Sequence, residues 1–170
     1  MNYARRLALL TAAVVTLASA LALQAAASPP NHANRFEATF SETTVSVTNR
    51  IADLGILQII NTGTGTVEDF GDATMIASVT QDRTLHPCGA GSWASTGIRR
   101  ISLDGGVLVL HGLVHICQTP SGPIGTGTWY VDGASSTGIF AGARGSGDSR
   151  IDVTTRISTL SGRLHLAEGE

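Results

Sequence analysis

Hydrophobic and polar residues alternate along most of the chain after residue 34, and no window there has a convincing helical repeat. Short runs rich in Val, Ile, Thr and Phe are separated by Gly and Asp-Gly, a pattern typical of antiparallel β domains. The clearest hairpin joins two such runs through Asp104-Gly105-Gly106, where glycine supplies the positive φ that a tight turn needs. We expect eight strands, at 35–48, 55–61, 65–81, 93–103, 107–118, 124–132, 143–155 and 158–166.

The predicted strand 107–118 is apolar on both of its faces. One face carries Leu108, Leu110, Gly112, Val114 and Ile116, and the other carries Val107, Val109, His111, Leu113, His115 and Cys117. Such a strand suits a closed barrel whose outside is partly covered or whose inside holds apolar side chains. The frequent glycines within other strands indicate a strongly coiled sheet. We therefore predict an all-β fold, a small closed antiparallel β-barrel of about eight strands. A two-sheet β-sandwich is the alternative.

The first 27 residues have the pattern of a cleavable secretory signal. Arg5 and Arg6 precede an apolar run from residue 7 to 23, which is followed by Ala25-Ala26-Ala27. An uncleaved membrane anchor is the alternative, but the run is rich in Ala and Thr and marginal for the roughly 20 apolar residues of a span. We expect a Sec-type signal peptide at 1–27, a flexible leader at 28–34 and a barrel domain at 35–166. The mature protein is then secreted and keeps no stable membrane anchor.

Removal of this signal changes the charge of the protein. The whole chain has 11 basic and 13 acidic residues, and the signal takes away two arginines and no acids, which moves the formal net charge from −2 to −4. The mature chain contains no lysine, and its nine arginines are scattered along the sequence. Because nucleic-acid binding needs a clustered basic surface, we expect no nucleic-acid partner.

Two cysteines, Cys88 and Cys117, follow the signal. In an oxidising compartment an even number of cysteines favours pairing, and with two the connectivity is forced. A bridge would close a loop of about 30 residues and stabilise the fold by roughly 3 to 4 kcal/mol on the chain-entropy model. Two buried free thiols are the alternative. The wide spacing does not fit a zinc site or a redox motif.

A glycine-rich segment late in the chain, Thr137-Gly138-Ile139-Phe140-Ala141-Gly142-Ala143-Arg144-Gly145-Ser146-Gly147, resembles a stretch of the allene oxide cyclase and dirigent-like barrels, especially their small bacterial members. Other features occur in the same order, among them Gly63-Thr64-Gly65-Thr66, Leu85-His86-Pro87 and Gly125-Thr126-Gly127-Thr128-Trp129. The resemblance covers roughly residues 35–155 and implies a barrel that can enclose one small apolar ligand. It carries over no catalytic residue, because 36–48 does not match the early polar residues of the plant proteins. Within the segment, Phe140 is the large side chain expected to plug the barrel end.

Acidic and basic side chains provide the candidates for chemistry. Alternation places Glu68 and Asp72 on one face of a strand and Asp69 on the other, and a carboxylate inside an apolar barrel would have a raised pKa suited to acid or base catalysis. Exposed acids that discourage edge pairing are the competing interpretation. The adjacent Arg99 and Arg100 point to opposite faces, so the inward one is a candidate anchor for an anionic ligand group.

Histidines and aromatic residues give further candidates. His111 and His115 share a face but lie about 13 Å apart on a strand, too far for one metal. The predicted bridge would bring His86 near His115, and two imidazoles with an acid can bind a metal or move protons; surface histidines with local hydrogen bonds are the alternative. We predict no metal site and no cofactor, and keep His111 as a catalytic candidate. Trp129 and Tyr130 are candidate ligand contacts, whereas core or rim packing is the competing interpretation for them and for Trp93.

No nucleophile elbow, phosphate-binding loop, dinucleotide fingerprint or zinc-hydrolase motif occurs in the sequence. This absence argues against a hydrolase. The doubly apolar strands and the family resemblance lead to the first hypothesis, a secreted barrel that binds a small apolar molecule in its cavity. A cyclase- or isomerase-type enzyme that steers a reactive substrate by cavity shape is the second. The third is a structural or surface-interaction protein, which predicts a filled barrel and an exposed apolar patch. The pattern leaves the oligomeric state and the identity of the ligand open.

Overall fold

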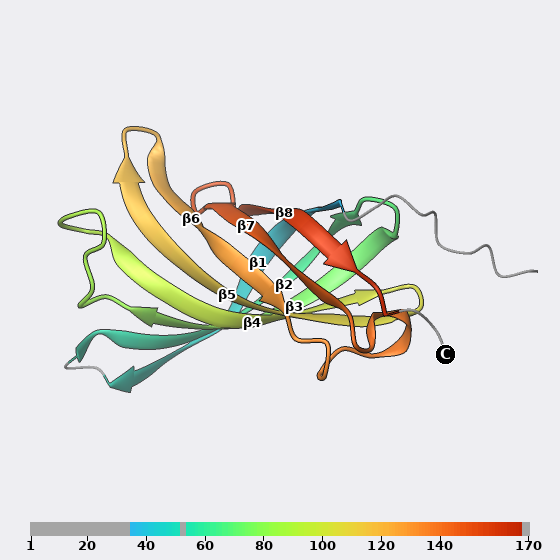
Figure 1. The fold of residues 1–170 in the computed structure, drawn as a ribbon. Coiled ribbons are helices and arrows are strands. Elements are labelled where there is room, and N and C mark those ends of the chain that lie inside the picture. The colour runs from blue at the N-terminus through green and yellow to red at the C-terminus, as the bar shows by residue number, and fades with distance from the viewer. Residues whose placement is uncertain (1–34, 52–53, 168–170) are drawn as a thin grey trace, which may run out of the picture. The chain divides into compact units, whose positions relative to one another are not determined.

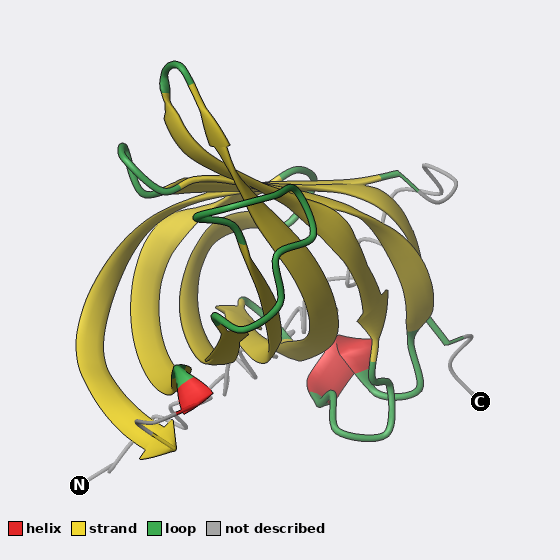
Figure 2. Ribbon diagram, turned by 90° about the vertical axis from the view of Figure 1, so that its left-hand side faces the viewer, coloured by secondary structure: helices red, strands yellow, loops and turns green. Residues whose placement is uncertain are grey.

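The computed structural model describes residues 35–51 and 54–167, which form an eight-stranded antiparallel barrel. Each strand pairs with its neighbours in sequence, and β8 returns to pair with β1, so the sheet closes into the ring that Figure 2 shows. The predicted closed barrel is confirmed, and the two-sheet sandwich is wrong. The predicted signal at 1–27 and leader at 28–34 lie outside the described residues. The strands, which Figure 1 labels, are β1 (Phe36–Ile51), β2 (Ile56–Val67), β3 (Gly71–Asp82), β4 (Trp93–Leu103), β5 (Gly106–Thr119), β6 (Gly122–Val131), β7 (Arg144–Asp152) and β8 (Ile157–His165). A short 3-10 helix, η2 (Gly138–Phe140), lies between β6 and β7.

The boundary between β2 and β3 corrects the sequence prediction. We expected a break at 62–64 and one strand over 65–81, whereas β2 runs to Val67 and the turn lies at 68–70. Glycine in this part of β2 marks a close approach of strands instead of a turn, because a Cβ at residue 65 would collide with the carbonyl oxygen of Thr39 on β1. The turn itself uses positive φ angles at Asp69 (66°) and Gly71 (84°).

The barrel has two different ends. At one end, which we call the closed end, the strands are connected by the turns 68–70 and 104–105 and by the loop 132–143. At the other end, which we call the open end, lie the connections β1–β2, β3–β4, β5–β6 and β7–β8. Beyond Thr44 the strand β1 shifts register against β2, and its pairing with β8 stops at Ser41. The β1–β2 hairpin therefore extends past β8 at the open end (Figure 1).

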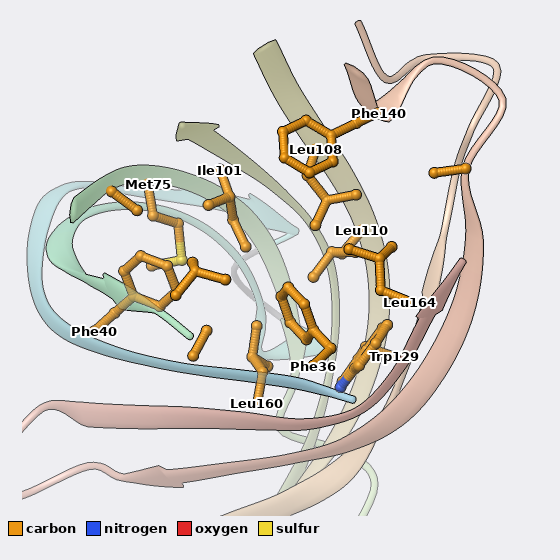
Figure 3. Packing of buried hydrophobic residues seen from close by; sticks show 14 of the residues in the cluster. Phe36, Phe40, Met75, Ile101, Leu108, Leu110, Trp129, Phe140, Leu160 and Leu164 are labelled. Carbon is orange, nitrogen blue, oxygen red and sulfur yellow. The ribbon is translucent and has the colours of Figure 1, made fainter. Parts of the chain in front are cut away.

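The hydrophobic core fills the barrel toward its closed end. Alternation along each strand points every second side chain inward, and these inward positions hold large apolar residues here. The ring centroids of Phe36 and Trp129 lie 5.1 Å apart in an edge-on arrangement, and the indole Nε1 of Trp129 donates a hydrogen bond to the carbonyl oxygen of Asp148. Figure 3 shows the labelled members of this core pointing toward one another: Phe36, Phe40, Met75, Ile101, Leu108, Leu110, Trp129, Phe140, Leu160 and Leu164.

The β6–β7 loop, which contains η2, covers this end. Phe140 is fully buried (0% exposed) and packs on Phe70 with ring centroids 5.3 Å apart. Only glycine fits at 138, where φ is +62° and a Cβ would strike the carbonyl oxygen of Gly105. The hydroxyl of Ser136 accepts a hydrogen bond from the backbone N–H of Val109, so the loop also covers part of the outside of β5. Val109, on the outer face of β5, is accordingly 1% exposed.

A disulfide bridge ties together two segments of the open end. Cys88, in the β3–β4 loop, is bonded to Cys117 of β5, with the two Cα atoms 5.5 Å apart. The predicted bridge is confirmed, and the alternative of free thiols is wrong. Within the same loop, the hydroxyl of Ser92 accepts a hydrogen bond from the backbone N–H of Cys88. The carbonyl oxygen of Ser92 lies 3.0 Å from Nδ1 of His86.

Among the described residues, no helix is both long and apolar enough to cross a membrane.

Candidate ligand-binding site

A cavity of about 290 Å³ occupies the open half of the barrel. The strands that form the core also line it, but their inward positions become small or polar on approach to the open end. On β4 the inward series runs from Ile101 through Arg99 and Gly97 to Ser95, and on β5 it passes from Leu110 to Gly112. The barrel is therefore filled at one end and hollow at the other.

The walls of the cavity combine aliphatic and aromatic side chains with polar and charged ones. Trp129 lies between the packed core and the hollow half, since it belongs to the core cluster and also lines the cavity. A cavity with apolar walls and a few convergent polar groups is the usual form of a small-molecule site, and its volume is close to the lower end of the roughly 300–1,000 Å³ of such sites. The apolar wall residues are Ile59, Val79, Leu110, Val114, Ile116, Ile151 and Val153.

Two oppositely charged side chains, Glu42 of β1 and Arg99 of β4, face each other in this cavity. Glu42 is 5% exposed, and the side chain of Arg99 is 13% exposed. The carboxylate Oε1 and the guanidinium Nη2 are 3.9 Å apart, which is close enough for attraction between charges but too long for a hydrogen bond. Burial lowers the pKa of Arg99, and the nearby Glu42 carboxylate acts in the opposite direction.

Neighbouring polar groups hold this pair in place. Asn61 of β2 donates from Nδ2 to Oε2 of Glu42 (3.1 Å) and accepts at Oδ1 from the hydroxyl of Thr44 (2.9 Å). Across the barrel, Arg99 donates from Nη1 to the hydroxyl of Ser149 on β7 (3.2 Å). One oxygen of the carboxylate and one terminal nitrogen of the guanidinium are therefore fixed by hydrogen bonds.

Several of these polar atoms are buried without a hydrogen-bond partner. Within the described part of the chain, the cavity-lining atoms of this kind are Oε1 of Glu42, Nε of Arg99, Nε1 of Trp93 and Oγ of Ser95. Leaving a buried donor or acceptor unpaired costs about 1–3 kcal/mol, and more for a charged group. Their concentration on one cavity indicates a site built to form hydrogen bonds with an occupant.

The mouth of the cavity carries two further arginines. The guanidinium of Arg83 lies 5.3 Å from the ring centroid of Trp93, a cation–π contact that holds the indole against the mouth. Arg156, in the β7–β8 connection, donates from Nη1 toward the hydroxyl of Thr44 at 3.4 Å. Both arginines are exposed, so the cavity reaches the surface between them.

Of the residues predicted as ligand contacts, the structure brings Arg99 and Trp129 to the cavity. Of the two adjacent arginines, Arg99 faces the inside of the barrel and Arg100 is exposed on the outer surface. Tyr130 is 56% exposed and also points outward. Trp93, which we expected to pack in the core or at the rim, lines the cavity mouth.

Of the catalytic candidates named from the sequence, Glu68 and Asp72 lie away from the cavity, whereas His111 is among the residues that line it, although its ring packs on Tyr130. Glu68 is exposed in the closed-end turn, where its carboxylate is 3.8 Å from Nε of Arg35, and Asp72 is exposed on β3. Their predicted place on one continuous strand is wrong, because 68–70 is a turn. The ring of His111 stacks on the exposed Tyr130 at 5.1 Å, and its Nε2 is 3.3 Å from Oδ2 of Asp132. None of these three side chains joins the Glu42–Arg99 pair.

Sequence reasoning missed Glu42, Asn61 and Ser95. The available signal for Glu42 was its position on the same alternating face as Phe36, Ala38 and Phe40, where a carboxylate continues an otherwise apolar series. The sequence gives no comparable signal for Asn61 and Ser95, because asparagine and serine are common in β domains.

Comparisons with known proteins add no family to this picture. No protein-family model and no curated protein matches the chain. In the region that the structure describes, no group of three or more His, Cys, Asp or Glu residues could hold a metal ion. The geometry of the cavity is therefore the basis for a functional assignment.

Proposed function

We propose that this protein is a secreted β-barrel that binds a small, largely apolar molecule in its open-end cavity. The single observation that carries the proposal is the hollow half of the barrel, about 290 Å³ with aliphatic walls and unpaired polar atoms turned into it. In a purely structural protein we would expect large apolar side chains to fill the barrel as far as the open end. The disulfide bridge is consistent with an extracellular protein.

A cavity-filling variant tests this proposal. Gly112 lies on the inner side of β5, and a Cβ there would meet only the carbonyl oxygen of Thr128, at 3.4 Å, so Gly112→Val adds a side chain to the cavity without a backbone clash. His115→Val is the matched control, because it places valine at an exposed outward position of the same strand. The wild-type protein and the control should bind a neutral lipophilic dye such as N-phenyl-1-naphthylamine, measured by fluorescence and by native mass spectrometry. Gly112→Val should bind it about tenfold more weakly or not at all.

The outcome that contradicts the proposal is equally clear. If the wild-type protein binds no lipophilic probe at micromolar concentration, the cavity is not a binding site. If Gly112→Val binds the dye as well as the wild type does, the probe occupies another surface.

An enzyme of the cyclase or isomerase type is a second candidate, and a specific feature favours it. The buried Glu42–Arg99 pair sets charged groups in a confined apolar space, where a reactive substrate would be held in one conformation. The resemblance of 137–147 to allene oxide cyclase and dirigent-like barrels carries over no catalytic residue, so this candidate rests on the charged pair and the shape of the cavity. Incubation with epoxide or polyene substrates should then change the stereochemistry of the products, and an unchanged racemic product would count against it.

A further inference from the structure

The gap between Glu42 and Arg99 has the dimensions of a site for one additional oxygen atom. Oε1 of Glu42 and Nη2 of Arg99 are 3.9 Å apart, and an oxygen placed beside them can lie within hydrogen-bond distance of both. Among the residues described, Oε1 receives no hydrogen bond and Nε of Arg99 donates none. The pair therefore contains one carboxylate oxygen and one guanidinium nitrogen that have no hydrogen-bond partner among these residues.

The charges of the pair select the kind of group that can enter. A carboxylate or phosphate placed against Arg99 would also lie against the buried Glu42 carboxylate, and an ammonium placed against Glu42 would lie against the guanidinium. Both arrangements bring like charges together in a medium of low dielectric constant, where repulsion is strong. A neutral hydroxyl avoids this conflict, because its hydrogen can be donated to Oε1 while its oxygen accepts from Arg99.

The surroundings of the pair define the rest of the molecule. Between Arg99 and the mouth, the inner face of β4 is bare at Gly97, and the neighbouring β5 offers Val114 and Ile116. The part of a ligand that extends from Arg99 toward Trp93 at the mouth therefore contacts aliphatic carbon. The limited volume of the cavity excludes a long lipid chain.

We propose that the cavity recognises a small neutral alcohol, with an apolar body against Val114 and Ile116 and its hydroxyl lodged between Glu42 and Arg99. This inference rests on the proposed function, since it names the class of ligand for the same cavity. Glu42 and Arg99 are then the residues that determine specificity, and the aliphatic walls supply the affinity that is common to all apolar probes.

A matched series of eight-carbon probes tests the inference on the wild-type protein. Octan-1-ol can both donate and accept a hydrogen bond, its isomer 1-methoxyheptane can only accept, and octanoate and octylammonium carry opposite charges. Displacement of N-phenyl-1-naphthylamine should give octan-1-ol an affinity about tenfold or more above that of the ether, because a hydrogen bond to a charged group is lost. Both charged probes should bind more weakly than the alcohol.

The variant Glu42→Gln sharpens the same experiment. Without its negative charge the site should accept octanoate about tenfold better than the wild-type site does, and the preference for alcohol over ether should shrink. Glu37→Gln is the matched control, because Glu37 lies on the same strand but pairs with Arg35 at the exposed surface, and it should leave all four affinities unchanged. If Glu42→Gln does not fold, the wild-type series alone decides the question.

The possible results separate the two proposals. Equal binding of octan-1-ol and 1-methoxyheptane overturns the hydroxyl site but leaves an apolar binding cavity. Tighter binding of octanoate than of octan-1-ol by the wild-type protein also overturns it and identifies an anion site. Failure of every probe, including the dye, overturns the proposed function together with this inference.

Discussion

The two ends of this barrel are built from the same strands by the same alternation, yet they are stabilised in different ways. At the closed end the inward positions hold side chains such as Phe36, Phe40 and Leu160, which are almost completely buried. At the open end the corresponding positions hold Glu42, Arg99 and glycine, and they surround a cavity. The closed end is stabilised by packing, whereas the open end depends on a disulfide and on polar side-chain contacts.

This difference indicates a division of roles within one sheet. Burying a large apolar side chain stabilises a fold by about 1.5–3 kcal/mol, so the closed end supplies most of the stability of the barrel. The open end leaves apolar surface uncovered and several buried polar atoms without a hydrogen-bond partner, which is a cost to stability that a ligand can offset. Binding capacity and stability should therefore respond to different substitutions.

The largest expected effect comes from breaking the charged pair on one side only. Arg99→Met leaves the buried Glu42 carboxylate without its counter-charge and should lower the free energy of unfolding by about 3–5 kcal/mol. The double variant Glu42→Met/Arg99→Met removes both charges and should lie within about 1 kcal/mol of the wild type or above it. Urea unfolding of the three proteins measures the difference. A double variant as unstable as the single one would mean that the pair holds the open end together.

The next effect concerns the covalent link at the open end. Replacing both cysteines, Cys88→Ala with Cys117→Ala, should lower the free energy of unfolding by roughly 3 to 4 kcal/mol, because the unfolded chain is no longer constrained. The loss should also weaken dye binding, since the bridge ties the β3–β4 loop, next to Trp93, to β5. Denaturation with and without a reducing agent measures the first effect. Wild-type protein whose stability is unaffected by reduction would contradict it.

A matched pair of isoleucines compares the two ends directly. Ile101→Ala, at a site that is 0% exposed in the core, should cost about 3 kcal/mol. Ile151→Ala, on the half-buried cavity wall, should cost about half of that or less, because its side chain already faces open space. Equal losses in urea unfolding would show that the hollow end is packed as tightly as the core.

The sequence predicted the fold well because the fold is encoded in local alternation. The doubly apolar series from Val107 to Cys117 favoured a closed barrel over a two-sheet sandwich, and a cysteine count of two, together with the predicted export, favoured a bridge between Cys88 and Cys117 over free thiols. The break between β2 and β3 was misplaced because glycine serves two purposes, turns and close strand contacts, and only the neighbouring strand shows that Gly65 serves the second.

The candidate site was predicted only in part. Adjacent residues on a strand point to opposite faces, so the sequence could state that one of Arg99 and Arg100 faces inward but not which. Glu42 becomes notable only when Arg99, 57 positions later by sequence number, is placed opposite it by the closure of the barrel. Acidic residues that looked promising, such as Glu68, were chosen for their local pattern, and a turn placed them at the surface.

The smallest expected effect concerns the loop that covers the closed end, and it depends on pH. Asp132 begins this loop, and hydrogen bonds from Ser135, together with the nearby His111, hold the pKa of its carboxyl below the usual value. A carboxyl whose pKa is lowered by folding stabilises the protein above its unfolded pKa of about 4, and that contribution is lost as pH falls through the folded value. Asp132→Asn should therefore lower the melting temperature at pH 6 to 7, and the difference from the wild type should vanish on acidification. Asp104→Asn, in the exposed β4–β5 turn, is the control. A difference for Asp132→Asn that stays constant down to pH 3 would show that the loop is held by its shape and not by this charge.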